Sequence, residues 1–416
     1  MAELTPSIEA LQKRGVHIPH PESVFLSDDV NPDHIAPGVV LHPGTRLGGA
    51  ALSIGPDAEI GSEAPMTLIN CQLGHRVKLK GGYAERTVFM DDASGGSGMH
   101  VRAGCILEEQ ASIAHSVGLK QTILMPYVTL GSLINFCDCL MAGGTSRTNH
   151  SEVGSSYIHF NFTPHGDKAT PSLIGDVPAG VLLNQPPIFL GGQGGLVGPA
   201  RVGYGVVLAA GSIQRGDALA SGHLYRSGVE QASEPVPYPL EAYRSIRRIV
   251  KNNLVYIGNL LALKDWYEVV RKPLMLDDQY HQACWAGAQS SLELLLTERI
   301  KRLAQVAEKM PASIAAIEAM PSSAATARAL AEQRSFAASW ENMQAALMQT
   351  LDAAHGDETA RLAFTSAWQM SSKASDYLTL VHALSDTARQ AAATWLQSIV
   401  DQAATHANVF DTAETE

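Results

Sequence analysis

The sequence lacks long apolar runs and a basic N-terminal segment that leads into an apolar core. A membrane-spanning helix needs about 18 uninterrupted apolar residues, so membrane insertion is not expected. The opening residues MAELTPSIEALQKRG differ from a secretory signal peptide. Cysteine is scarce as well, and five thiols in 416 residues, an odd number, indicate a reducing compartment. We therefore expect a cytoplasmic protein.

Clusters of Lys and Arg are also missing, and the formal net charge is −11. Binding to a phosphate backbone needs basic patches, so a nucleic-acid partner is not expected. The chain is 45% hydrophobic and 17% charged, which is typical of a folded protein and excludes a disordered one. Its length exceeds what one ordinary core accommodates, so more than one domain is expected.

A six-residue apolar period begins near residue 31, after a mixed lead-in over residues 1–30. Aliphatic residues that lie six positions apart include Ile35, Leu41, Leu47, Leu196, Val202 and Leu208. This period fits neither a helix nor an alternating strand. It fits a β-solenoid, in which each short strand forms one side of a coil and equivalent aliphatic residues stack inside. A β-sandwich is the alternative, but its strands usually recur every 8–12 residues, so we predict a hexapeptide-repeat solenoid over residues 31–220.

The composition changes after residue 220. Residues 221–240 contain three prolines and are typical of a linker. Glycine then becomes rare, and apolar residues follow the i, i+3, i+4 spacing of amphipathic helices. We predict an all-α helical bundle over residues 241–416, with helices over 279–310, 323–354 and 359–407. It carries no catalytic signature, so its predicted role is assembly or docking.

The stretch 148–176 interrupts the six-residue period with polar and ionisable side chains. Those of interest are His150, His159, Asn161, His165 and Lys168. A repeat protein that breaks its own pattern in this way usually does so at a functional site. Earlier in the chain, Arg102 and Lys120 stand among apolar or small residues. Two cations on successive coils would form a clamp for a phosphate group.

Two other patterns resemble binding motifs but do not fit them. Cys137 and Cys139 share one face of a strand, but zinc sites normally use C-x₂₋₄-C pairs and no second pair exists, so no metal is predicted. Residues 191–195, GGQGG, have no following Lys-Ser/Thr and no helix, so they do not form a phosphate loop. The Gly-rich insert around them is either a lid over a groove or a plain surface excursion.

Five segments together resemble a known family. They are HVRAG-x-ILEE, VGLKQ, LGSLINF, HFNF followed by KA, and LVGPARVGYGVVLAAGSIQRGD. They are similar to the acetyltransferase half of the bacterial bifunctional UDP-N-acetylglucosamine pyrophosphorylase/glucosamine-1-phosphate N-acetyltransferase. The resemblance covers residues 18–217 and implies a left-handed parallel β-helix that forms a homotrimer with sites between subunits. The nucleotidyltransferase half has no counterpart here, and the family does not account for the C-terminal helices.

The resemblance also implies roles for individual residues. Arg102 and Lys120 match the pair that binds the sugar phosphate. Asn161 and Phe162 match an Asn-aromatic pair that contacts the amino sugar. Lys168 matches a Lys near the oxyanion, although the intervening loop differs by one residue.

The general base is where the sequence departs from the family. Ser132 stands in place of the family's His, and Asn135 stands in place of a nearby Tyr. A Ser hydroxyl cannot take a proton at neutral pH without a base of its own. An additional repeat brings in His150, which we predict to be a relocated base. His159 and His165 are rivals for this role.

The predicted catalytic set is therefore Ser132, His150 and Lys168. As the resemblance implies, Ala209 and Ala210 leave room for the pantetheine arm of acetyl-CoA as co-substrate. We predict an N-acyltransferase that acts on an amino-sugar phosphate or a nucleotide sugar, as in UDP-N-acetylglucosamine formation. The alternative, favoured by Ser132, is a non-catalytic protein that binds sugar nucleotides or serves as a scaffold.

Overall fold

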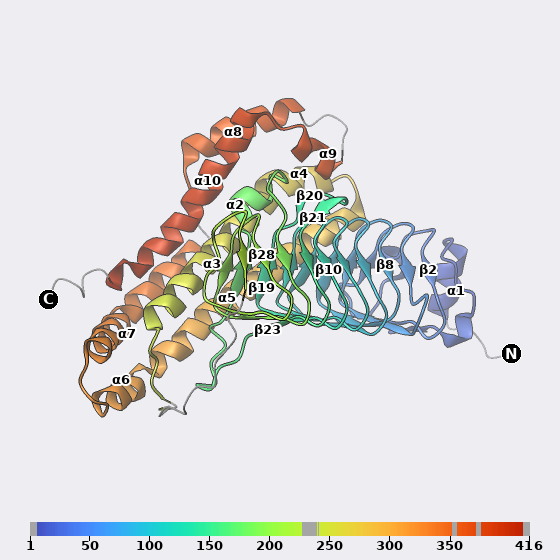
Figure 1. The fold of residues 1–416 in the computed structure, drawn as a ribbon. Helices are drawn as coiled ribbons and strands as arrows, with labels where there is room; N and C mark the ends of the chain where they lie inside the picture. The colour runs from blue at the N-terminus through green and yellow to red at the C-terminus, as the bar shows by residue number, and fades with distance from the viewer. Residues whose placement is uncertain (1–5, 227–238, 240, 352–355, 372–375, 411–416) are drawn as a thin grey trace.

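The computed structural model describes residues 6–226, 239, 241–351, 356–371 and 376–410 (Figure 1). Most of the predicted linker, residues 227–238 and 240, lies outside these residues. Three parallel sheets form the sides of a solenoid in the N-terminal half of the chain, and helices cover one side of it (Figure 1). The predicted fold class, a left-handed parallel β-helix followed by helices, is confirmed.

The chain passes repeatedly through the three sheets, which we call A, B and C. Sheet A has 10 strands: β2 (Val40–Leu41), β5 (Glu59–Ile60), β8 (Lys78–Leu79), β11 (Ser94–Gly95), β14 (Ser112–Ile113), β17 (Thr129–Leu130), β22 (Glu152–Val153), β25 (Phe189–Leu190), β28 (Val207–Leu208) and β30 (Leu224–Tyr225). Sheet B has 10 strands: β1 (Phe25–Leu26), β3 (Arg46–Gly48), β6 (Met66–Ile69), β9 (Gly82–Glu85), β12 (Met99–Val101), β15 (Gly118–Lys120), β18 (Asn135–Cys137), β23 (Ile158–Phe160), β26 (Gly195–Val197) and β29 (Ile213–Arg215). Sheet C has 8 strands: β4 (Ser53–Ile54), β7 (Gln72–Leu73), β10 (Thr87–Phe89), β13 (Cys105–Leu107), β16 (Ile123–Leu124), β19 (Cys139–Met141), β24 (Ser172–Ile174) and β27 (Arg201–Val202).

The six-residue period creates this architecture because the aliphatic positions of successive coils pair with one another. In sheet A, Leu41 pairs with Ile60, which pairs with Leu79 on the next coil. All three side chains are fully buried inside the coils. Stacking of this kind removes the apolar residue of every strand from water. The first strand, β1, lies within the lead-in and already pairs with β3 of sheet B.

A short hairpin departs from the coils within the interrupted stretch. It consists of β20 (Gly144–Ser146) and β21 (Asn149–His150), which pair antiparallel. It connects sheet C to sheet A at the corner after β19, where other coils turn in a few residues. The additional repeat that the sequence indicates there is therefore an excursion at one corner of the solenoid.

Helices occupy the two ends of the described chain and one turn of the solenoid. The α-helices are α1 (Pro6–Lys13), α2 (Val177–Gly180), α3 (Ile246–Trp266), α4 (Lys272–Met275), α5 (Gln279–Glu308), α6 (Met310–Glu318), α7 (Ala324–Thr350), α8 (Glu358–Ser371), α9 (Tyr377–His382) and α10 (Asp386–Ala404). Shorter or irregular turns are η1 (Pro21–Ser23), η2 (Pro32–His34), η3 (Tyr267–Arg271) and η4 (Thr405–Phe410). None of the helices within the described ranges has the length and apolar character to cross a bilayer.

The observed helices differ from the predicted ones in two places, since α6 lies between two predicted helices and the predicted C-terminal helix is interrupted. The continuous helix expected over 359–407 is divided into α8, α9 and α10. Asp376 and Ser385 cap α9 and α10, and their side-chain oxygens accept hydrogen bonds from the backbone amides of Thr379 and Ala388. Caps of this type begin new helices, and apolar periodicity alone does not detect them.

The C-terminal helices share a core with the solenoid. Helix α5 packs against strands β4, β7, β10 and β13 of sheet C (Figure 1). One buried cluster joins Val88 and Ile106 of sheet C to Ile257 of α3 and Leu292 of α5. The predicted division into residues 31–220 and 241–416 stays a prediction, because these two parts bury a common apolar surface.

Candidate functional site

Each coil has three corners, and the predicted site residues lie at all three. The A–B corner follows a sheet A strand, the B–C corner follows a sheet B strand, and the C–A corner follows a sheet C strand. Side chains at corners are free of the tight stacking inside the coils, so corners can carry chemistry without disturbing the core.

Arg102 and Lys120 occupy adjacent positions on successive coils at the B–C corner. The Arg102 amide donates to the Leu119 carbonyl at 2.9 Å, which places Arg102 beside Lys120. Lys120 in turn pairs with Cys137 on the next coil, and Nη2 of Arg102 lies 3.8 Å from Sγ of Cys137. Within the described part of the chain, neither cation forms an ion pair with a carboxylate. The two are therefore arranged as a clamp for an anion would require.

The loop after β23 reaches the same corner. Nδ2 of Asn161 donates to Oδ2 of Asp138 at 3.2 Å, directly after Cys137. The buried Asp138 carboxylate pairs with Arg299 of α5 at 2.8 Å, and Arg299 also donates to the Lys168 carbonyl at 3.1 Å. Phe162 is 66% exposed. Arg299 thus holds both the Asp138 turn and the loop that carries the predicted substrate contacts.

Two histidines of the interrupted stretch have structural partners. Nδ1 of His159 donates to the Cys137 carbonyl at 2.6 Å, and Nε2 lies 2.8 Å from the Ser172 hydroxyl. Burial lowers the pKa of His159 to about 4, so the ring is neutral. The His165 ring stacks on Tyr243 with centroids 4.1 Å apart. His159 is therefore inaccessible to a substrate, and His165 joins the loop to the helical region.

His150 lies apart from the other predicted site residues. It belongs to the β20–β21 hairpin at the C–A corner, whereas Arg102 and Lys120 lie at the B–C corner. Its Nδ1 atom is buried and lacks a hydrogen-bond partner among the described residues. Within one chain, the fold does not bring His150 to the Arg102–Lys120 pair.

Ser132 lies at the A–B corner and has an imidazole partner that sequence reasoning missed. Its Oγ is 2.8 Å from Nδ1 of His115, one coil earlier in the solenoid. The Ser132 amide donates to the Ser155 hydroxyl on the following coil at 3.2 Å. The spacing of the coils could have revealed this contact. Equivalent positions on these two coils, such as Ser112 and Thr129, are 17 residues apart, so residue 115 must lie beneath residue 132.

Ala209 and Ala210 lie at this same A–B corner, further along the solenoid. Their neighbour Gly191 approaches them so closely that a Cβ atom there would meet the Ala210 nitrogen at 2.2 Å. Ala209 is half-buried and Ala210 is exposed. Small side chains at an accessible corner leave space beside the coils, as the pantetheine arm of acetyl-CoA would need.

Comparisons with known proteins agree with the motifs. No protein-family model matches the chain. It is 28% identical over 207 residues to "Bifunctional protein GlmU" of Thermotoga sp. (strain RQ2), which covers 50% of this chain and 41% of that protein. It is 28% identical over 219 residues to the protein of that name from Fervidobacterium nodosum, covering 52% of this chain and 43% of the relative. The chain thus spans less than half the length of the curated relatives that it matches.

A solved structure of the polysialic acid O-acetyltransferase OatWY gives a weaker likeness. The sequence identity is 13%, and the alignment covers 51% of this chain and 82% of that protein. The TM-score is 0.17, which supports no structural conclusion. The sequence relatives and the observed β-solenoid confirm the predicted resemblance to the hexapeptide-repeat acetyltransferase half of the GlmU proteins.

Proposed function

We propose that the protein transfers an acetyl group from acetyl-CoA to the amino group of an amino-sugar phosphate or nucleotide sugar. The observation that carries this proposal is the pair Arg102 and Lys120, side by side on successive coils without a carboxylate partner among the described residues. Stacked cations of this kind suit a phosphate. The resemblance to GlmU supports the same substrate class.

The residues at the B–C corner bind different parts of the substrate. Arg102 and Lys120 hold the phosphate, while Asn161 and the exposed Phe162 contact the sugar. Lys168 stabilises the negative charge that develops on the acetyl oxygen in the transition state. The buried Asp138–Arg299 pair positions Asn161 and the backbone of Lys168, and it is therefore a positioning device.

The reaction forms a carbon–nitrogen bond and breaks the carbon–sulfur bond of the thioester. The attacking amine must lose a proton, and the departing CoA thiolate gains one. We assign the proton transfer to Ser132 and His115, which lie at the A–B corner and would act on a sugar held at the B–C corner of a neighbouring copy. Ser132 accepts the amine proton while its own hydroxyl proton passes to Nδ1 of His115, 2.8 Å away. His150 stays a second candidate for the base, supplied by a neighbouring copy of the chain.

A homotrimer would bring different corners of neighbouring copies together. Support comes from an apolar row on sheet A, where Phe189 pairs with Val207 and Val207 with Leu224. These side chains are 40%, 37% and 51% exposed in the single chain. Exposed apolar rows of this length usually mark an interface. The mass in solution, measured by light scattering, tests the assembly.

The decisive experiment measures thiol release from acetyl-CoA with a panel of amino sugars, with and without a phosphate. We expect release with phosphorylated or nucleotide-linked acceptors. Lys120→Ala should raise KM for these acceptors about 10–100-fold, because a charged hydrogen bond contributes about 1.5–3 kcal/mol. The matched control, Lys78→Ala, removes an exposed lysine of sheet A and should leave KM unchanged.

The alternative, a non-catalytic sugar-nucleotide binder, predicts a different result with the same protein. If no acceptor releases thiol, but calorimetry shows binding of UDP-N-acetylglucosamine and none of acetyl-CoA, the protein is a non-catalytic sugar-nucleotide binder. Ser132, in place of the family's basic His, is the feature that favours this alternative. Loss of sugar-nucleotide binding in Lys120→Ala would then still locate the clamp.

A further inference from the structure

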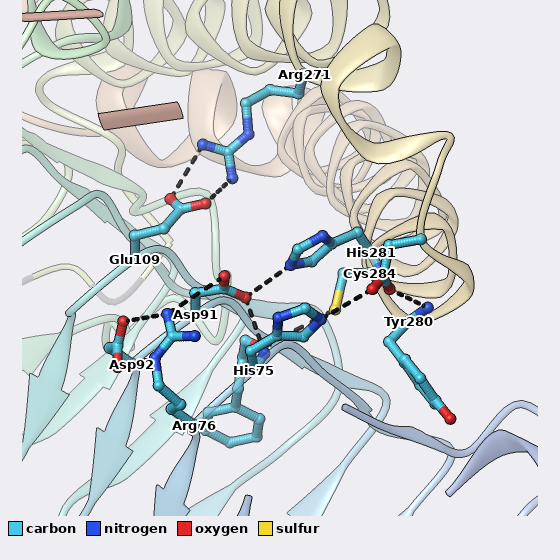
Figure 2. Close-up of polar contacts among 11 residues, drawn as sticks. His75, Arg76, Asp91, Asp92, Glu109, Arg271, Tyr280, His281 and Cys284 are labelled. Carbon is cyan, nitrogen blue, oxygen red and sulfur yellow. Dashed lines mark hydrogen bonds and ion pairs between the residues drawn. The ribbon is translucent and has the colours of Figure 1, made fainter. Parts of the chain in front are cut away.

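A cluster of metal-ligating side chains lies where the solenoid meets helix α5, at C–A corners of coils that precede the one carrying His150. His75 and Asp91 come from corners next to sheet C strands, and His281 comes from the first turn of α5 (Figure 2). One ligand atom from each of the three lies within 4.8 Å of the other two. Their side chains are 22%, 23% and 22% exposed, so the group is sheltered but reachable.

Asp91 is oriented toward the two histidines. Its Oδ1 accepts the His75 backbone amide at 2.8 Å and lies 2.9 Å from Nε2 of His281. Arg76 approaches the other oxygen, Oδ2, at 3.7 Å and makes its shorter contacts with Asp92 (Figure 2). The carboxylate therefore presents one oxygen to the space between the imidazole rings.

A second carboxylate fixes the His75 ring from outside. Oδ2 of Asp278 lies 3.1 Å from Nε2 of His75, which leaves Nδ1 of that ring for a ligand. Asp278 is itself held in place as the cap of α5, where its Oδ1 accepts the amides of Tyr280 and His281. A carboxylate that holds the far nitrogen of a histidine is the usual outer partner in zinc sites, since it sets the tautomer and the ring orientation.

The cluster opens onto a polar cavity of about 490 Å³. Its walls include Asp91, His281, Glu109, Arg271 and His382. Arg271 is fully buried and is neutralised by Glu109, with Nη2 and Oε1 2.6 Å apart. Solvent or a small anion in this cavity can therefore reach the cluster.

We propose that His75, Asp91 and His281 bind one divalent cation of the zinc type. Two imidazole nitrogens and one carboxylate oxygen are the donor set that zinc prefers when a fourth position is open. In a tetrahedral site with bonds of about 2.1 Å, the donor atoms lie about 3.4 Å apart, so the three ligands must draw together. The His75 and His281 rings stack at 4.2 Å and 19°, so one ring must also tilt. The 490 Å³ cavity, which Asp91 and His281 line, offers room for a fourth ligand.

Such an ion would join the solenoid to the helices. Two ligands belong to the solenoid and the third to α5, so binding adds a link across the common core. Any group that binds the folded but not the unfolded chain stabilises it by mass action. We therefore expect the cation to raise the melting temperature and to protect the start of α5 from proteolysis.

The test uses the full chain, dialysed against EDTA and then titrated with Zn²⁺ in competition with a chromophoric chelator. Co²⁺ serves as the spectroscopic probe, because its visible absorption reports a site with four or five ligands. We expect one equivalent per chain and a higher melting temperature. His75→Gln and His281→Gln should each abolish the cobalt spectrum. Asp278→Asn should weaken binding about 10–100-fold, as expected for an outer partner.

The matched control is His382→Gln. His382 lines the same cavity but hydrogen-bonds Tyr127, and it is not one of the three ligands. Its replacement should leave metal binding unchanged. Binding of less than one equivalent, or binding that survives in His75→Gln and His281→Gln, would overturn the proposal and leave two hydrogen-bonded His–Asp contacts only. Asp278→Asn keeps the test valid if a ligand variant does not fold.

Discussion

The Ser132 hydroxyl and the His115 imidazole form a pair across two successive coils, with Oγ 2.8 Å from Nδ1. Ser132 stands where the related acetyltransferases are expected to have a basic histidine. The fold thus places the His115 imidazole next to Ser132, the position at which the family has a histidine. Because histidine is the side chain that exchanges protons most readily near neutral pH, the proposed function assigns to this pair the base that Ser132 alone lacks.

Replacing His115 by Ala should lower kcat for acetyl transfer about 100-fold or more, with little change in KM. General-base catalysis accelerates a reaction about 10²–10⁴-fold. KM should change little because neither Ser132 nor His115 is assigned to substrate binding. Steady-state thiol release measures both constants. His150→Ala is the comparison: if it lowers kcat and His115→Ala does not, the base is the relocated histidine and not the Ser132–His115 pair.

The solenoid was predictable because its period is local. Equivalent aliphatic residues recur at nearly fixed intervals, and each must point inward, so stacking follows from spacing alone. The same reasoning placed Arg102 beside Lys120. It would also have placed His115 beneath Ser132, had the 17-residue separation of those coils been applied to polar residues.

The contacts across the common core were not predictable from spacing. His281 meets Asp91 across 190 residues of sequence, and Arg299 meets Asp138 across 161. Nothing local fixes which helical residue faces which coil, because that depends on how α5 lies on sheet C. The sequence predicted no metal site for this reason, since only cysteine spacing could be judged.

The buried ion pair between Arg299 and Asp138 yields a stability prediction. Replacing Arg299 by Met should lower the free energy of unfolding by about 3–5 kcal/mol, because it leaves a buried carboxylate without its partner. Urea denaturation followed by circular dichroism measures the change. Arg302→Met is the control, since its i, i+4 pair with Glu298 should contribute about 1 kcal/mol or less.

The double variant Asp138→Asn/Arg299→Met separates charge from packing. It removes both charges, so it should regain part of the stability lost in Arg299→Met. A double variant no more stable than the single one would mean that Arg299 acts mainly through its hydrogen bond to the Lys168 carbonyl.

The buried His159 predicts how stability depends on pH. Its pKa is lowered to about 4 by burial, against about 6.5 in an unfolded chain, so the unfolded state binds more protons between these values. The stabilising effect of the neutral ring is complete above pH 6.5 and is lost as the pH falls through 4. The loss should reach about 3 kcal/mol.

Unfolding at a series of pH values tests this, with His159→Gln as the variant. Gln cannot titrate, so its stability should fall less steeply between pH 6.5 and 4 than that of the natural chain. The comparison concerns the slope, because the variant also loses hydrogen bonds to Cys137 and Ser172. Parallel curves for the two proteins would contradict the prediction.

Helix α5 lies so close to sheet C that Gly287 has no room for a side chain. A Cβ atom there would lie 2.1 Å from Oε1 of Gln72 and 2.9 Å from Cγ2 of Val88. The Gln72 amide is held by the carbonyls of Ala51 and Asn70, at 2.6 and 3.1 Å, so it cannot move aside freely. At an unhindered helix position, Gly→Ala stabilises by about 1 kcal/mol. Gly287→Ala should instead destabilise the protein by about 1–3 kcal/mol through overpacking.

The double variant Gly287→Ala/Gln72→Ala tests whether the clash with Gln72 causes the destabilisation expected for Gly287→Ala. Removing the Gln72 side chain eliminates the shortest clash, so the double variant should be more stable than the sum of the two single changes predicts. The free energies of unfolding in urea for the four proteins give this coupling. Additive effects, or a stabilising Gly287→Ala, would show that α5 can move away from sheet C at little cost. The contact would then be looser than the interlocked core of Val88, Ile106 and Leu292 requires.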